Sequence, residues 1–173
     1  MSAHPTTFAP RPADAPESSS IEIVSPETLD SGPVSMGVRY WNALRGERPY
    51  PARGELVPAK MAKFLRNTVL VQVIDGGADY EYRVVGDAHV QAHGFNFRHM
   101  RLKQIEATRI DFSTRATYGH VRTTGVALAV RGWVGRHEPH SRFSYHETAF
   151  LPLGENGVVD HLLIVTAYVP RSV

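Results

Sequence analysis

The sequence predicts an α+β domain built on a five-stranded antiparallel sheet, with a helical crossover on one face and further helices at the N-terminal side. Two short β-branched runs come first, at 68–74 and 80–86, and three longer apolar runs close the chain. Between these two groups the apolar residues change to helical spacing. Apolar residues make up 42% of the chain and charged residues 21%, which is typical of a globular domain that buries its own core.

The N-terminal part of the chain divides into a tail and a helical region. Residues 1–26 are rich in Pro and Ser, and we expect them to be disordered because they carry little apolar surface to bury. Residues 33–66 are predicted to form the N-terminal helices and a Pro-rich loop. Within this region an amphipathic helix is expected over about 33–45, and Pro58 begins a short helix. The core of the domain is then predicted over residues 67–169.

The elements of this core follow from their local patterns. The turn DGGAD joins the first two strands as a hairpin. Short helical turns follow up to about residue 105, and a longer helix is predicted over 109–125, where Gly125 ends it. The last three strands, separated by the turns GRHEPHS and GENG, are predicted over 126–134, 142–153 and 158–168.

Three motifs stand in order along the chain. They are YWNALRGERPYPAR from Tyr40, YRVVG from Tyr82 with a further glycine at Gly94, and LPLGENGVVD from Leu151. Together they are similar to the alphaproteobacterial PAS family of stand-alone domains, over roughly residues 36–168. The resemblance implies a bacterial sensory or adaptor module that binds a small molecule between its helices and its sheet, and that forms a homodimer.

Composition excludes several classes of site. The chain has no cysteine, which rules out disulfides, thiolate metal sites, thiol nucleophiles and the cysteinyl–flavin adduct of light-oxygen-voltage domains. The net charge is only +2, so a nucleic-acid partner is not predicted. No apolar run reaches the roughly 18–20 residues that span a bilayer, and no signal peptide is recognised. We therefore predict a cytoplasmic protein without a membrane partner.

His89 and His93 depart from the pattern of the PAS family, which often has aliphatic or aromatic residues at these places. At i, i+4 spacing the two rings share one helix face, as haem or metal ligands do. Two histidines are too few for a closed metal site, so no metal site is predicted. The other interpretation places both rings at the rim of the pocket, hydrogen-bonded or solvated. Phe95 and Phe97 lie next to them and are also candidates for the pocket lining.

The late strands supply the other pocket candidates. Trp133, Tyr145 and His146 lie on strands whose inner sides line the pocket of this architecture, and Tyr118 on the long helix is expected to face them. His146 is either a ligand contact or a core histidine whose hydrogen bonds are satisfied within the protein.

The functional hypothesis is a PAS-like regulatory module that binds a small ligand, a protein partner or both. No catalytic motif is present, which counts against an enzyme. Only VPRSV follows residue 168, so the signal is expected to pass to a separate signalling protein or through a homodimer. The helix before the first strand often forms the dimer contact in PAS modules, which makes Tyr40, Trp41 and Leu44 interface candidates. The alternative for Trp41 is a place in the core of its own domain.

Two other functions stay open on the sequence. A small enzyme or ligand carrier with a cone-shaped α+β fold would need a buried base, for which His146 and Asp160 are the candidates. A haem sensor would use His89 or His93 as the axial ligand of the iron.

Overall fold

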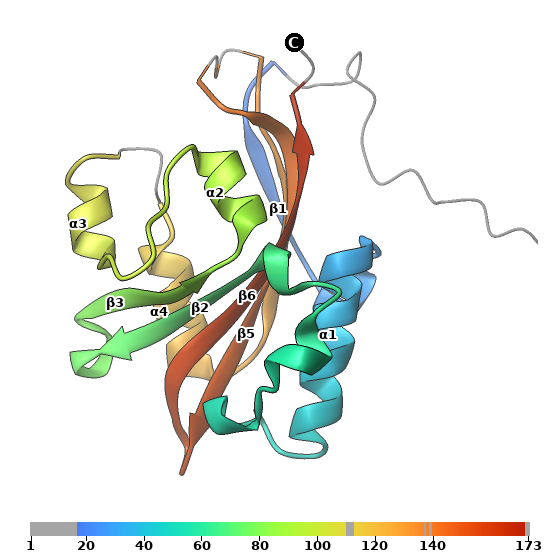
Figure 1. The fold of residues 1–173 in the computed structure, drawn as a ribbon, viewed down its shortest axis with the longest axis vertical. Helices are drawn as coiled ribbons and strands as arrows, with labels where there is room; N and C mark the ends of the chain where they lie inside the picture. The colour runs from blue at the N-terminus through green and yellow to red at the C-terminus, as the bar shows by residue number, and fades with distance from the viewer. Residues whose placement is uncertain (1–16, 110–112, 137, 139, 172–173) are drawn as a thin grey trace, which may run out of the picture.

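A six-stranded antiparallel sheet forms the centre of the computed structural model, which describes residues 17–109, 113–136, 138 and 140–171 (Figure 1). The order of the strands in the sheet is β1-β4-β5-β6-β2-β3. The strands are β1 (Ser20–Val24), β2 (Thr68–Ile74), β3 (Asp79–Val85), β4 (Leu128–Trp133), β5 (Phe143–Glu155) and β6 (Val158–Pro170). The helices are α1 (Gly32–Arg45), α2 (Asp87–His93), α3 (Leu102–Glu106) and α4 (Arg115–Thr124). The predicted α+β class and antiparallel sheet are confirmed.

Strand β1 is the sixth strand, which the sequence did not predict. It pairs with β4 along its whole length, from Ser20 opposite Trp133 to Val24 opposite Ala129. The expected disorder up to residue 26 is therefore wrong for residues 20–24. Ile21 and Ile23 each stay 70% exposed, so backbone hydrogen bonds rather than side-chain burial hold this strand. The expectation of disorder considered only the apolar surface that these residues could bury, so it could not predict a strand held by backbone pairing.

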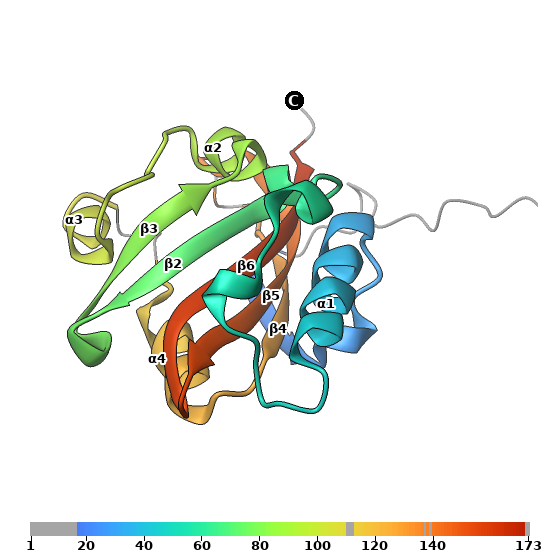
Figure 2. The same cartoon turned by 60° about the horizontal axis from the view of Figure 1, so that its bottom comes forward.

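The helices cover both faces of the sheet. Figures 1 and 2 show α1 and α4 on opposite sides. We call the side covered by α2, α3 and α4 the inner face and the side covered by α1 the outer face. Each face has its own hydrophobic core. Since side chains alternate between the faces of a strand, β5 contributes His146, Thr148 and Phe150 to the inner side and Glu147 and Ala149 to the outer side.

Helix α1 forms because its apolar residues recur at helical spacing. Val34, Val38 and Trp41 lie on one stripe, and all three are buried against the outer face. The helix predicted from Pro58 is a single 3-10 turn, Pro58–Met61. The helix predicted over 109–125 is shorter at its start, as α4 begins at Arg115, while residues 110–112 lie outside the described part of the chain.

None of the helices within the described residues has both the length and the apolar character needed to cross a membrane.

Candidate functional site

A cavity of about 280 Å³ lies between the inner face and the helical crossover. Its walls come from β2, β3, β4, β5 and β6 of the sheet, from α2 and α4, and from Ile21 of β1. The described residues that line it include no Asp, Glu, Lys or Arg. The volume lies near the lower end of the ~300–1,000 Å³ that is usual for ligand pockets. The cavity therefore suits a small, uncharged molecule.

Five of the eight residues proposed from the sequence as pocket candidates line this cavity. They are His89, His93, Phe97, Tyr118 and His146. Phe95 does not line it. Its ring packs against Phe97 at 5.4 Å between centroids, and the guanidinium of Arg109 lies over its other side at 4.9 Å.

Trp133 and Tyr145 lie on the outer face, so their placement in the pocket was wrong. Their rings pack together with centroids 5.2 Å apart, and the Tyr145 hydroxyl donates a hydrogen bond of 2.8 Å to Glu147 Oε1. The register pairs Gly132 with His146, which points its ring into the cavity, and the neighbouring residues of both strands consequently point outward. The period-two alternation around His146 is the sequence signal that separates these aromatics from the pocket.

The structure adds cavity residues that were not among the sequence candidates. Thr148 follows His146 on the inner side of β5, and Thr166 and Tyr168 lie on the inner side of β6. Phe143 lines the cavity as well. The two threonines were missed because small hydroxyl residues in an apolar strand carry no motif, although their spacing of two from His146 and Tyr168 places them on the same face.

A chain of hydrogen bonds joins α2 to the sheet at one end of the cavity. The carbonyl oxygen of Asn67 can only accept, so His89 donates to it from Nε2 at 2.8 Å. His89 Nδ1 then accepts from the Tyr168 hydroxyl at 3.0 Å. Because that hydroxyl has one proton, His93 Nε2, at 3.2 Å, donates to the oxygen of Tyr168. The tautomer of His89, with its proton on Nε2, follows from this network.

His89 is neutral in this network. The residue is only 3% exposed, and burial lowers its pKa to about 4, with a smaller contribution from the nearby His93 and an opposing one from the hydrogen bond to Asn67. Burial also raises the pKa of the Tyr168 hydroxyl, which therefore stays protonated at neutral pH. The cavity thus presents neutral donors and acceptors at this end.

The same geometry does not fit haem ligation by His89. Both of its ring nitrogens are engaged, so binding iron would break the bond to Tyr168 or the bond to Asn67. The cavity volume of about 280 Å³ is also small for a macrocycle. Within the described residues, no group of three or more His, Cys, Asp or Glu side chains is arranged to hold a metal ion.

A second polar cluster lies on the sheet side of the cavity. His146 Nδ1 is 3.1 Å from Thr148 Oγ1, which in turn is 3.1 Å from Thr166 Oγ1. Burial lowers the pKa of His146 to about 4, so its ring is neutral too. The ring lies directly over Gly132, where a Cβ atom would collide with Nε2. Glycine at this position leaves the space that the Nε2 end of the imidazole ring occupies.

Aromatic side chains form a further part of the cavity wall. The hydroxyls of Tyr82 and Tyr118 are 3.0 Å apart, and Phe97 meets Tyr82 edge to face with centroids 4.9 Å apart. Burial raises the pKa of both tyrosines, so both are protonated. This part of the wall is apolar over most of its surface, and its polar atoms include the two hydroxyls of Tyr82 and Tyr118, which pair with each other.

The three interface candidates on α1 have different surroundings. Trp41 is 4% exposed and donates from Nε1 to the carbonyl of Pro152 at 2.8 Å, so it packs in the core of its own domain. The Tyr40 hydroxyl accepts a hydrogen bond from the backbone N–H of Val57 at 2.9 Å and stays half-buried. Leu44 is also half-buried. Of the three, Tyr40 and Leu44 keep surface that a second molecule could contact.

Of the two bases considered for an enzyme, only His146 lies at the cavity. Asp160 is half-exposed and pairs with the adjacent His161 at 2.8 Å, outside the cavity lining.

Comparison with known proteins places the fold in a family. A search of curated proteins found no match. Among solved structures the chain is similar to an RNA-binding light-oxygen-voltage receptor, with 14% sequence identity and a TM-score of 0.47. That match covers 89% of this chain and 39% of the receptor chain, so this chain spans well under half the length of the receptor. The model of the PAS domain matches residues 31–163, from the start of α1 into β6. Because this span is well over half of the sequence, the chain belongs to the PAS domain family.

Proposed function

We propose that this chain is a cytoplasmic sensory or regulatory module that binds a small, uncharged and largely apolar ligand in the cavity of the inner face. The single observation that carries the proposal is the lining of that cavity. It combines hydrogen-bonding groups at one side, from His93, Tyr168 and His146, with aromatic and aliphatic side chains elsewhere. A charged ligand would meet no opposite charge among the described residues of this lining. A volume of about 280 Å³ has room for about nine waters, hence for a compact organic molecule.

Strand β5 offers a path from the cavity to the outer face. Its inner residues His146 and Thr148 line the cavity. The next residue of the strand, Ala149, points to the other side and packs in the core beneath α1. The carbonyl of Pro152 holds Trp41 of α1. A ligand that shifts β5 would therefore bias how α1 packs, which is a population shift between two arrangements of the same domain.

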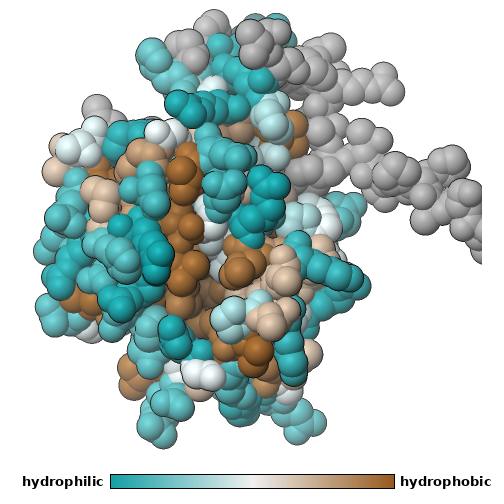
Figure 3. Space-filling view, viewed as in Figure 1, coloured by the Kyte–Doolittle hydropathy of each residue, from teal (hydrophilic) through white to brown (hydrophobic). Residues whose placement is uncertain are grey.

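The signal is proposed to pass to a second copy of the chain or to a separate signalling protein, through the side that carries α1. Tyr40 and Leu44 keep exposed surface on this helix. The view in Figure 3, which is the view of Figure 1, shows an apolar, hollowed strip bordered by hydrophilic residues. Apolar strips of this kind are common at protein contacts. Light scattering coupled to gel filtration is expected to report a dimer that Leu44→Glu converts to a monomer. A monomeric wild-type protein at all concentrations would contradict the homodimer.

Cavity filling tests the ligand proposal. Val130→Phe places a larger side chain in the cavity, and Val158→Phe makes the same change at an exposed position at the start of β6. Uncharged fragments about the size of indole are expected to raise the melting temperature of the wild type and of Val158→Phe, but not of Val130→Phe. An undiminished response of Val130→Phe would contradict binding in the cavity. Native mass spectrometry of the protein as purified then identifies the molecule that it retains.

A further inference from the structure

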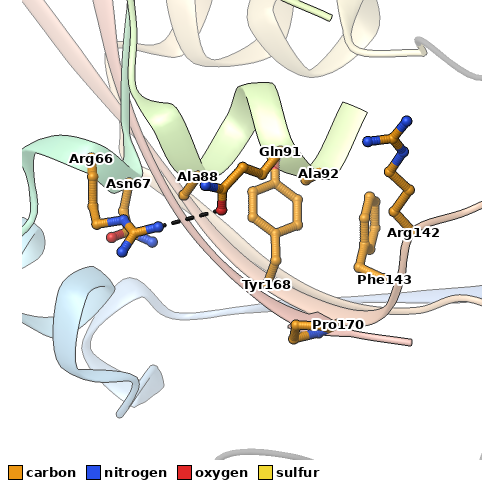
Figure 4. A pocket seen from close by; sticks show the side chains of 9 residues that line it. All are labelled: Arg66, Asn67, Ala88, Gln91, Ala92, Arg142, Phe143, Tyr168 and Pro170. Atoms are coloured by element: carbon orange, nitrogen blue, oxygen red, sulfur yellow. Dashed lines mark hydrogen bonds between the residues drawn. The ribbon is translucent and has the colours of Figure 1, made fainter. Parts of the chain in front are cut away.

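A second concave surface lies outside the cavity, on the other side of Tyr168 and Phe143. This groove has a volume of about 380 Å³ and runs between α2 and the ends of β5 and β6. Figure 4 shows Arg66 at one end and Arg142 at the other, with the rings of Tyr168 and Phe143 between them. Small side chains on α2, among them Ala88, leave the space above these rings open.

Positive charge without a carboxylate partner marks both ends of the groove. None of the described residues that line it is acidic. Arg66 makes one long hydrogen bond of 3.4 Å, to the neutral side chain of Gln91, and Gln91 itself donates to Asp87 at 3.0 Å. Within the described part of the chain, no side-chain hydrogen bond or ion pair of Arg142 is found. Most of the donors of both guanidinium groups are therefore available to a ligand.

The position of Arg142 has its own physical basis. Its guanidinium lies over Gly94, which ends α2, with the central carbon 2.8 Å from where a Cβ atom would stand. The last carbonyl groups of a helix favour a cation at that end. The end of α2 therefore favours the charge of Arg142 beside the groove through its dipole, without a hydrogen bond between the described residues of that end and its guanidinium.

We propose that this groove is a second ligand site, which takes a small organic dianion with an apolar body and an acid group at each end. Arginine forks bind carboxylates through paired, charge-assisted hydrogen bonds, which accounts for the two ends. The rings of Tyr168 and Phe143, whose centroids lie 4.8 Å apart and whose planes meet at 58°, supply an apolar floor for the body of the molecule. The ligand differs in kind from that of the inner cavity, where the lining residues that the structure describes include no Arg or Lys.

The two sites share a wall. Tyr168 and Phe143 line both the groove and the cavity, and Tyr168 is also the centre of the hydrogen bonds to His89 and His93. A dianion that rests on Tyr168 would hold that ring, and α2 with it, in place. The groove is therefore placed to change how readily the cavity accepts its own ligand.

Titration calorimetry with naphthalene-2,6-dicarboxylate tests the site, with the neutral naphthalene-2,6-dicarboxamide as the paired probe. The dicarboxylate is expected to bind at least about tenfold more tightly than the dicarboxamide. Arg66→Gln and Arg142→Gln are each expected to weaken it by about five- to twentyfold, the range for loss of a partly exposed charge-assisted pair. Arg39→Gln removes an exposed arginine from α1 and should leave the affinity within twofold of the wild type.

Three results would overturn the proposal. The first is equal affinity for the two probes, and the second is an affinity that stays within twofold in both Arg66→Gln and Arg142→Gln. The third is loss of dicarboxylate binding in Val130→Phe, because that variant fills the cavity and leaves the groove open. Melting temperatures of all variants are measured alongside, so that a folding defect is not read as a binding defect. Val130→Phe fills only the cavity. If only the groove proposal is wrong, the dicarboxylate does not bind as predicted while the uncharged fragments still distinguish Val130→Phe from the wild type. If only the cavity proposal is wrong, the reverse is found.

Discussion

His89 makes the stability of this protein depend on pH in a way that can be worked out from its surroundings. In the unfolded chain a histidine takes up a proton below its ordinary pKa of 6.5, whereas burial holds the pKa of His89 in the folded protein at about 4. The unfolded state thus binds more protons between these two values, and stability must fall as the pH falls through them. Above pH 6.5 the contribution is fully present.

The size of the effect follows from the same two pKa values. At pH 5.0 the unfolded histidine is almost wholly protonated and the folded one mostly neutral, which costs about 2 kcal/mol of unfolding free energy. Below pH 4 the loss approaches about 3 kcal/mol. His89→Gln removes the titrating group, so the loss between pH 7.5 and 5.0 should be about 2 kcal/mol smaller in this variant than in the wild type.

Urea unfolding at pH 7.5, 6.0 and 5.0, followed by far-UV circular dichroism, measures these free energies. Only the change of the unfolding free energy with pH enters the comparison, so a difference in absolute stability between the variant and the wild type does not affect it. His120→Gln is the control, because His120 is exposed on α4 and its removal should leave the pH dependence as in the wild type. An identical pH dependence in His89→Gln and wild type would refute the reasoning.

Three further variants test the network, the α1 contact and the cavity wall. Tyr168→Phe leaves His89 with a buried acceptor and no donor, and should lower the unfolding free energy by about 1–3 kcal/mol in urea titrations. Trp41→Phe deletes the hydrogen bond to Pro152 and should cost about 1 kcal/mol; a thermal shift within error would contradict it. Gly132→Ala places a methyl group against an imidazole ring and should lower the melting temperature by several degrees, measurable by calorimetry.

The strands of the core could be predicted because their sequence patterns are local. The runs at 68–74 and 158–168 are β-branched or apolar, and the structure has strands at Thr68–Ile74 and Val158–Pro170. Strand β1 escaped prediction since its residues gain little burial and are held by pairing with β4, a partner more than 100 residues away in the chain. A long-range backbone contact of this kind has no local signature.

In the candidate site, too, features with a local sequence pattern could be predicted and features that depend on contacts distant in the chain could not. His146 and Tyr118 were assigned to the pocket on the order of the elements alone, and both line the cavity. Trp133 and Tyr145 were assigned on residue type without the face of the strand, and they lie on the outer side. The pairing of Tyr168 with two histidines of α2 joins residues about 75 positions apart, so only the folded arrangement reveals it.

The most direct test of the central claim is methyl NMR during titration with an uncharged fragment that raises the melting temperature. The account predicts the largest shifts at the methyl groups of Val69, Val130 and Ile164, which line the cavity, and smaller shifts at those of Val38 on α1 and Val165 in the outer core, which follow the movement of β5. Shifts confined to the outer core, with the three cavity residues unmoved, would contradict a ligand site on the inner face.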